Sequence, residues 1–300
     1  MRTRLSEPHE VDRTRSRRVA REHALVLSAR GISYEQHREG SARVLWVERA
    51  DADEARRQLA RFDEENRNWP PEELDTPLLT SGGFAAVAYL LTLAMFHIAG
   101  TGFIPIVDWA AAGQNDSTRV LQGEWWRPVT ALTLHADVIH LAGNLLFGAV
   151  FVAAVCQLVG SGVGLLAILL SGAAGNWINV LVRGPGHLSL GASTAVFGAV
   201  ALLVSIQWCR REGQGRGGRA RRWTLLAAGL AFLGFLGMSG ERTDVPAHVA
   251  GFLAGLLVGL LLELGPWRNR FQRAQSQGLA ILALLALLLL SWGQAIRFGA

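Results

Sequence analysis

The sequence predicts an all-α polytopic membrane protein that carries a small cytosolic α+β domain in its amino-terminal part. Half of the 300 residues are hydrophobic and only 18% are charged, and the mean hydropathy is +0.26, unlike the composition of soluble domains. The chain after residue 82 also contains apolar runs of about 20 residues, the length of helix that crosses a bilayer core of roughly 30 Å. We place seven such spans near residues 83–104, 129–153, 162–182, 190–209, 223–239, 246–264 and 277–296.

The positive charge lies where it would orient these spans. All 29 basic residues are arginine, and the isoelectric point is near 10.4. The arginines gather before residue 70 and in two loops, one at 210–222 and one that holds Arg268, Arg270 and Arg273. Because cytoplasmic loops carry an excess of positive charge, we expect both loops and the amino-terminal part to be cytoplasmic, with a bacterial plasma membrane as the setting. This placement favours contact with the lipid bilayer, and we expect no nucleic acid as a partner.

The polar part before residue 78 has no early apolar run, so we expect no cleavable secretory signal. Short strands are predicted at Ala24–Ser28 and Ala42–Val47, followed by a helix at Asp51–Asn66 whose first turn is acidic. The limits that we expect are 1–21 for a disordered basic tail, 22–68 for the α+β domain, 69–82 for a linker, 83–264 for a helical core and 265–300 for a cytoplasmic loop with the last span.

One serine in the fourth span is a candidate nucleophile. Ser193 lies in the stretch Leu188 to Val200, LSLGASTAVFGAV, two residues after Gly191 and between small residues that leave its hydroxyl accessible. In the alternative interpretation this hydroxyl only hydrogen-bonds a carbonyl of the preceding turn, or the small residues only allow helices to pack. The stretch is therefore a hypothesis until partners for the serine are found.

His248 in the sixth span is the candidate base. Ser193 lies 17 residues before Arg210, and His248 lies 15 residues before Glu263; these separations correspond to about 25 and 22 Å of helix. The two side chains are therefore expected at a similar depth, near the outer face. A neutral imidazole can take the proton of a hydroxyl near pH 7. The alternative for His248 is a helix cap or a contact with lipid headgroups.

A stripe of small residues favours a protein-facing His248. Ala247, Gly251, Gly255 and Gly259 recur every four residues, a pattern that lets a membrane helix approach another backbone closely. His248 lies within one residue of this face. We expect the partner to be the fourth span, whose own small residues are Ala192, Ala195 and Ala199.

The second span supplies candidates for stabilising an oxyanion. His140 and Asn144 lie one helical turn apart, and both side chains can donate hydrogen bonds. In the alternative interpretation Asn144 only joins two helices. His135 and Asp137 lie nearer the outer surface, where they would line a path for water or cap the helix. The two cysteines have no metal-ligand spacing, so we expect no metal and no cofactor.

Four short motifs follow one another on the expected outer side of the membrane. They are Trp126-Arg127, the run His135 to Asn144 (HADVIHLAGN), Gly191-Ala192-Ser193-Thr194 followed by Phe197-Gly198, and Ala247-His248-Val249-Ala250-Gly251. With these motifs, residues 84 to 264 resemble the rhomboid family of intramembrane serine proteases.

The resemblance implies a rhomboid-like six-helix catalytic core in which Ser193 is the nucleophile and His248 its general base, without a third acidic member. It implies that the side chains of His140 and Asn144 and the backbone amide of Ser193 hold the oxyanion. In the supporting positions, Phe197 matches an aromatic residue against the catalytic imidazole, Gly251 a glycine that lets helix six lie on helix four, and Trp126-Arg127 a structural feature of the first loop. The seventh span is similar to the extra carboxy-terminal helix of members with six plus one helices.

The implied function is a serine endopeptidase that cleaves transmembrane segments of other membrane proteins near the outer face. One position departs from the family, because Thr194 stands where a glycine often follows the serine, and a β-branched residue stiffens the backbone there. The alternative function is a rhomboid-like protein that binds membrane clients without cutting them. A small-solute transporter is less consistent with the sequence, because the polar residues lie toward one face and no inverted repeat is evident.

Overall fold

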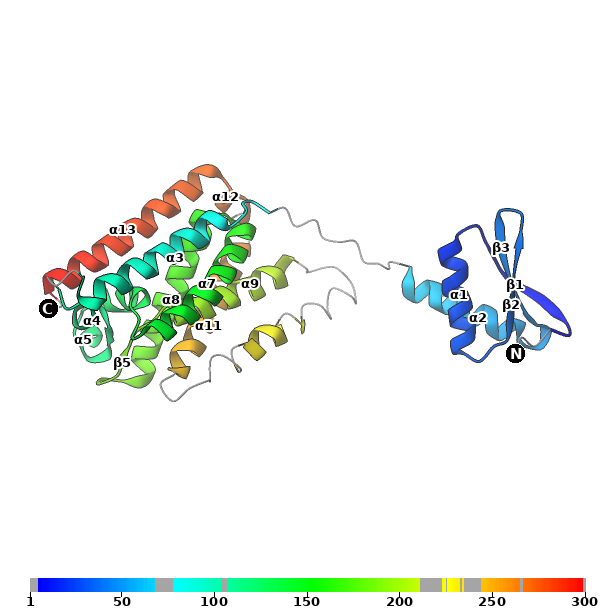
Figure 1. Cartoon of the computed structure of the whole chain (residues 1–300), viewed down its shortest axis with the longest axis horizontal. Coiled ribbons are helices and arrows are strands. Elements are labelled where there is room, and N and C mark those ends of the chain that lie inside the picture. Colours follow the sequence, from blue (N-terminus) through cyan, green and yellow to red (C-terminus); the bar gives the residue numbers. More distant parts are fainter. Residues whose placement is uncertain are drawn as a thin grey trace. The chain divides into compact units, whose positions relative to one another are not determined.

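The protein is described by a computed structural model that divides into two units, Met1–Asp75 and Thr76–Ala300 (Figure 1). The residues described are 5–67, 78–103, 107–210, 223–224, 226–232, 234, 244–264 and 267–298.

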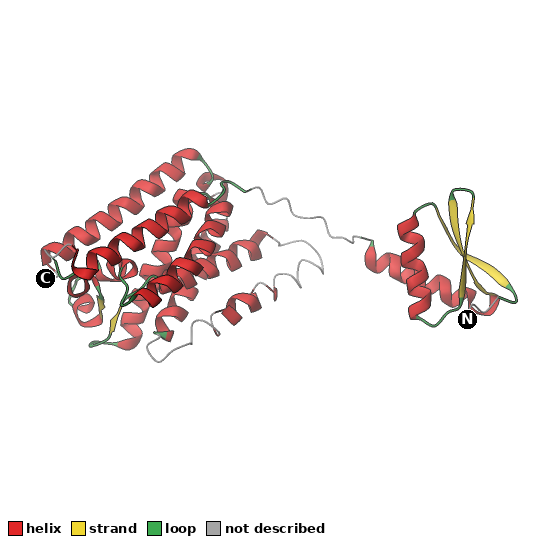
Figure 2. Cartoon of the chain, viewed as in Figure 1, coloured by secondary structure: helices red, strands yellow, loops and turns green. Residues whose placement is uncertain are grey.

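The amino-terminal unit is an α+β domain with both helices on the same side of a small sheet (Figure 2). Its elements are β1 (Pro8–Thr14), α1 (Arg17–Ala29), β2 (Tyr34–Glu39), β3 (Ala42–Glu48) and α2 (Ala52–Asn66). The strands are antiparallel in the order β1-β3-β2. Leu27, Leu45, Val47 and Leu59 pack in one apolar cluster between the helices and the sheet, so this unit has a core of its own.

Two expectations for this unit are wrong. The described part of the expected disordered tail, residues 5–21, forms β1 and the start of α1, because β1 pairs along one edge of β3. The strand expected at Ala24–Ser28 lies inside α1, which begins where the Ser16 side chain accepts a hydrogen bond from the amide of Val19. The strand over 42–47 and the helix over 51–66 lie as expected, each to within one residue.

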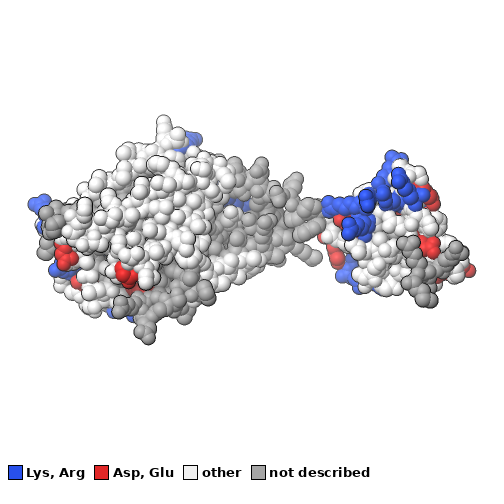
Figure 3. Space-filling view, in the orientation of Figure 1, with Lys and Arg blue, Asp and Glu red and all other residues white. Residues whose placement is uncertain are grey.

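Six helices of the second unit are long and apolar enough to cross a bilayer, counting only the described residues. They are α3 (Gly83–Ile98, continued by the turn η2, Ala99–Phe103), α7 (Val138–Val159), α8 (Ser161–Arg183), α9 (Ser193–Arg210), α11 (Val245–Glu263) and α13 (Ala274–Phe298). In Figure 3 the flank of this helical unit is almost free of charged side chains, as a lipid-facing surface requires. The fifth expected span, 223–239, lies largely outside the described residues.

The second span was expected at 129–153, but its helix α7 begins only at Val138. Asp137 adopts extended backbone and its carboxylate accepts a hydrogen bond from the amide of His140, which fixes the start of the helix. The preceding chain forms short helices, α6 (Arg127–Thr130) and η3 (Ala131–Thr133), that belong to the first loop. Earlier in this loop lie α4 (Trp109–Gly113), β4 (Asn115–Asp116), which pairs with β5 (Leu188–Ser189), and α5 (Ser117–Leu121).

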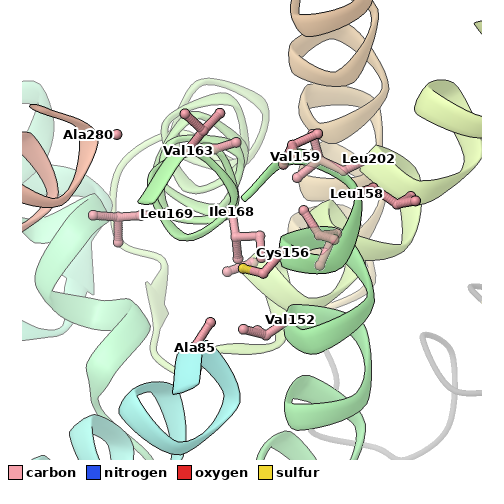
Figure 4. Packing of buried hydrophobic residues seen from close by; sticks show 14 of the residues in the cluster. Ala85, Val152, Cys156, Leu158, Val159, Val163, Ile168, Leu169, Leu202 and Ala280 are labelled. Carbon is pink, nitrogen blue, oxygen red and sulfur yellow. The ribbon is translucent and has the colours of Figure 1, made fainter. Parts of the chain in front are cut away.

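Helix α8 lies at the centre of the apolar core. Its side chains Val163, Ile168 and Leu169 pack with residues of the neighbouring helices (Figure 4); these residues include Ala85 of α3, Val152 and Cys156 of α7, Leu202 of α9 and Ala280 of α13. Helix α13, expected as the extra span, is joined to the α7–α8 turn by Gln277, whose side chain donates to the carbonyl of Val159 and accepts from the amides of Gly162 and Val163. The carboxy-terminal helix is therefore part of the bundle.

Helices α9 and α11 are parallel and in contact along their length. A Cβ atom on Gly251 would collide with the carbonyl oxygen of Thr194, and one on Gly255 with the carbonyl oxygen of Gly198. At the far end Arg210 forms a buried ion pair with Glu263, at 2.7 Å. The expectation that the small-residue stripe of span six lies against span four is thus confirmed by these contacts.

Candidate active site

The starts of the parallel helices α9 and α11 bring Ser193 and His248 together. Ser193 is the first residue of α9, and His248 lies in the first turn of α11 with 7% of its surface exposed. The hydroxyl Oγ of Ser193 lies 2.8 Å from Nε2 of His248. With the ring proton on Nδ1, Nε2 accepts this hydrogen bond and can take the proton. The two groups meet, as the depth of the two helices predicted.

The chain before Ser193 follows a path that only glycine permits. Gly191 has φ of 131°, and a Cβ atom there would lie 2.5 Å from Cε1 and 2.7 Å from Nε2 of His140. The ring of His140 therefore lies directly against the loop that leads to the serine. The backbone amide of Ser193 is at the start of a helix of 18 residues, where amides have no partner within the helix and the helix dipole favours negative charge.

Helix α7 places the two oxyanion candidates beside this loop. The side-chain amide of Asn144 donates to the carbonyl of His140 at 3.0 Å, and Asn144 is 5% exposed. The carbonyl of Asn144 accepts from the hydroxyl of Tyr89 on α3 at 2.9 Å, so a second helix holds this part of α7. Tyr89 was not singled out from the sequence, where a tyrosine in an apolar run gives no sign of its partner.

His135 lies closer to the site than expected. Its Nε2 accepts a hydrogen bond from the amide of Ala192 at 3.4 Å, and its ring centre lies 5.2 Å from that of His140. Burial lowers the pKa of His135 to about 3, consistent with a neutral ring that accepts at Nε2. The residue that caps α7 is Asp137. His135 thus supports the residue that precedes Ser193.

The imidazole of His248 is packed against an aromatic ring. The ring centres of Phe197 and His248 are 4.6 Å apart with an angle of 37° between the planes, and Phe197 lies one turn after Ser193 on the same face of α9. This contact restricts the ring of His248 to orientations near the serine. Thr194 is 3% exposed, and its Cγ2 lies 2.7 and 2.8 Å from the positions that Cβ atoms on Gly175 and Gly251 would take.

A cavity of about 1040 Å³ opens onto these groups. Its lining includes Ser193, His248, His140, Asn144 and Phe197. Polar side chains and open volume are what a water-filled site needs, and the cavity is large enough to admit an extended peptide segment. Within the part of the chain that the structure describes, no group of three or more His, Cys, Asp or Glu side chains could hold a metal ion.

Trp126 and Arg127 organise the first loop. Arg127 is fully buried, and its NH1 donates to the carbonyl oxygens of Ala111 (3.0 Å) and Gln114 (2.9 Å), while its Nε pairs with Glu124. A single guanidinium thus holds carbonyl groups that the loop's short helices leave unpaired. Trp126 is 7% exposed and packs in a cluster with Trp292 of α13.

In the comparison with known proteins, the sequence model of the rhomboid domain matches residues 122–264, the segment that holds every site residue expected from the sequence. The chain belongs to the rhomboid family. With its six described apolar helices, this rhomboid is an integral multi-pass membrane protein.

Three named proteases illustrate the similarity. The chain is 36% identical to Rhomboid-like protease 3 of Toxoplasma gondii over 134 residues, 44% of this chain and 49% of that protein. It is 30% identical to Rhomboid protease GluP of Bacillus subtilis over 174 residues, 58% and 33% of the two chains. It is 31% identical to a Rhomboid protease GlpG homolog of Cronobacter sakazakii over 180 residues, 59% and 61%. The matched region thus spans between a third and three fifths of these relatives.

Proposed function

We propose that this rhomboid is an intramembrane serine endopeptidase that cleaves transmembrane segments of other membrane proteins. The observation that carries the proposal is the 2.8 Å hydrogen bond between Ser193 and His248 at the edge of a polar cavity. A hydroxyl is a weak nucleophile until a base takes its proton, and an imidazole aligned on that hydroxyl is this base. Relatives that are named proteases support the same activity.

The reaction follows from the positions of these groups. His248 Nε2 takes the proton of Ser193 as Oγ attacks the scissile carbonyl carbon, and the carbonyl oxygen becomes an oxyanion. The side chains of His140 and Asn144 and the amide of Ser193 stabilise that charge. The imidazolium then gives its proton to the leaving amine, which departs and leaves an acyl ester on Ser193. Water, activated by the same imidazole, hydrolyses the ester and restores the hydroxyl.

The substrate is a membrane-spanning helix that must unwind locally, because a helical peptide bond has its carbonyl engaged within the helix. We therefore expect preference for segments that contain Gly, Pro or other weak helix formers. The site lies at the starts of α9 and α11, and Arg210 and Glu263 lie at the opposite ends of these helices. We therefore expect cleavage near the outer face of a bacterial plasma membrane, with the amino-terminal unit in the cytoplasm and no cofactor.

Cleavage of a reporter helix by the purified protein in lipid vesicles tests the proposal. The reporter carries one unstable transmembrane segment, and the variants Ser193→Ala and His248→Ala serve as matched controls. We expect cleavage by the wild type, a mass shift of Ser193 on reaction with a fluorophosphonate, and loss of both in each variant. Binding of the reporter that is equal in the wild type and the serine variant, without cleavage or labelling, would instead indicate a protein that holds membrane clients.

A further inference from the structure

A partly buried carboxylate beside the cavity has no part in the reaction above. Asp244 directly precedes α11, and its side chain is 17% exposed. Its Oδ2 accepts a hydrogen bond from the side-chain amide of Asn179 at 2.7 Å and lies 2.7 Å from Nε2 of His187. Its Oδ1 accepts from the guanidinium of Arg183 at 3.2 Å. Arg183, His187 and Asp244 all line the cavity.

The partners of Asp244 come from the segments that place the serine and the histidine. Two of them belong to the carboxy-terminal part of α8, and His187 lies in the chain that runs from α8 to Ser193. The backbone carbonyl of Asp244 accepts from the amide of His248 at 3.2 Å. A single residue therefore joins the first turn of the histidine's helix to the loop that precedes the serine.

The loop itself is anchored, so it provides a fixed reference for Asp244. The amide of His187 donates to Oγ of Ser117 at 2.9 Å, and the carbonyl of His187 accepts from the amide of Ser117 at 2.9 Å. The next two residues form β5, which pairs with β4 of the first loop. The first loop, the loop before Ser193 and α11 are thereby connected in one network.

The charge of Asp244 makes this network sensitive to the loss of any member. Burial raises the pKa of Asp244, but the hydrogen bonds from His187, Arg183 and Asn179 outweigh it and hold this pKa below its ordinary value. The carboxylate is therefore ionised at neutral pH. Removing one partner of a partly buried charge leaves that charge less well compensated, and the surrounding segments must rearrange to solvate it.

We propose that Asp244 is a positioning residue that fixes the start of α11 against the loop before Ser193, and so holds the His248 imidazole within bonding distance of the serine hydroxyl. This inference rests on the proposed function. Along the rest of their length, α9 and α11 touch mainly through glycines and small residues. Such contacts restrict the distance between the two helices more than the rotation of either helix about its axis. A misplacement of about 1 Å at a reacting group can cost up to about 100-fold in rate.

The experiment compares the wild type with Asp244→Ala, His187→Leu and His187→Gln in lipid vesicles, well below their thermal midpoints. Glutamine is the matched control because its side-chain amide can still donate to Asp244. The readouts are kcat and KM for the reporter helix per folded molecule, the rate at which a fluorophosphonate labels Ser193, and the ¹⁵N imidazole signals of His248. These signals are assigned by their absence in His248→Gln.

We expect Asp244→Ala and His187→Leu to lower kcat and the labelling rate by about tenfold or more while KM stays within about twofold. In His187→Gln, kcat and the labelling rate should stay near the values of the wild type. The double variant Asp244→Ala/His187→Leu should lose no more activity than Asp244→Ala alone, because the hydrogen bond that His187→Leu removes is already absent in Asp244→Ala. The imidazole signals of His248 should shift in Asp244→Ala.

The inference would be overturned if Asp244→Ala had the same kcat and labelling rate per folded molecule as the wild type, or if this variant changed KM alone. Failure of the proposed function is distinguishable, since the wild type itself would then neither cleave the reporter nor react with the fluorophosphonate. In that event the imidazole signals still decide the matter, because a shift in Asp244→Ala supports positioning and unchanged signals refute it.

Discussion

Alanine in place of Gly251 tests the helix contact on which the Ser193–His248 pair depends. The added Cβ atom would collide with the carbonyl oxygen of Thr194 and lie 2.8 Å from its Cγ2. Backbone atoms of packed helices do not yield, so α11 must retreat from α9 by about 1 Å. Overpacking of this kind costs about 1–3 kcal/mol, of which the helix propensity of alanine returns up to about 1.

The consequence for activity is larger than that for stability, because position 251 lies one turn after His248. A shift of about 1 Å at the imidazole should lower kcat by about 10- to 100-fold. Thermal unfolding in lipid and cleavage of the reporter helix measure the two effects. Gly293→Ala is the matched control, since a Cβ atom there meets nothing within 4 Å. If Gly251→Ala unfolds and cleaves like this control, the account of the α9–α11 contact is wrong.

Three further predictions concern single side chains. Thr194→Ser removes only the methyl group that packs against Gly175 and Gly251 and should destabilise the bundle by about 1 kcal/mol in thermal unfolding, while Ser193 still reacts with a fluorophosphonate. Arg127→Met leaves two loop carbonyls without their donor and should cost about 3 kcal/mol, read as a lower unfolding midpoint and faster proteolysis of the first loop. In the amino-terminal unit the pKa of His23 is raised to about 9, chiefly by its hydrogen bond with Asp12. The raised pKa, to which Asp63 also contributes, should therefore add up to roughly 3 kcal/mol of stability below about pH 6.5, lost as the pH rises through 9. Limited proteolysis should accelerate over this range in the wild type and not in His23→Gln.

The membrane helices and the meeting of Ser193 with His248 could be predicted because both depend on numbers of residues that can be counted along the sequence. The length of an apolar run decides whether a helix can span, and residue counts from charged ends set the depth of a side chain. The start of the second span was missed for the same reason. Hydropathy continues through residues 129–134, whereas the helix begins where Asp137 supplies a cap, a feature that an average over many residues conceals.

The amino-terminal helix was missed because its buried face contains a charged group. The buried positions of α1 are Ala20, His23, Ala24 and Leu27, spaced as one face of a helix, but a histidine and many arginines hide the apolar periodicity. His23 is accommodated by Asp12 at 2.9 Å and Asp63 at 2.9 Å, from β1 and α2. Pairing between distant segments is not visible in a local pattern, and the same holds for Asp244 and its three partners.

Thr194, which stands where the family often has a glycine, is buried between helices α8, α9 and α11. Its Cγ2 lies 2.7 Å from the position that a Cβ atom on Gly175 of α8 would take and 2.8 Å from that of a Cβ atom on Gly251 of α11, so the branched side chain packs against glycines of two neighbouring helices. Gly251 is needed in any case, because a Cβ atom there would collide with the backbone carbonyl oxygen of residue 194. With threonine at position 194, Oγ of Ser193 lies 2.8 Å from Nε2 of His248. Because α9 and α11 are also joined by Arg210 and Glu263 at their far ends, the geometry of the pair depends on the whole helix contact rather than on the residue beside the nucleophile. The threonine at position 194 is therefore accommodated without separating the Ser193 hydroxyl from the His248 imidazole.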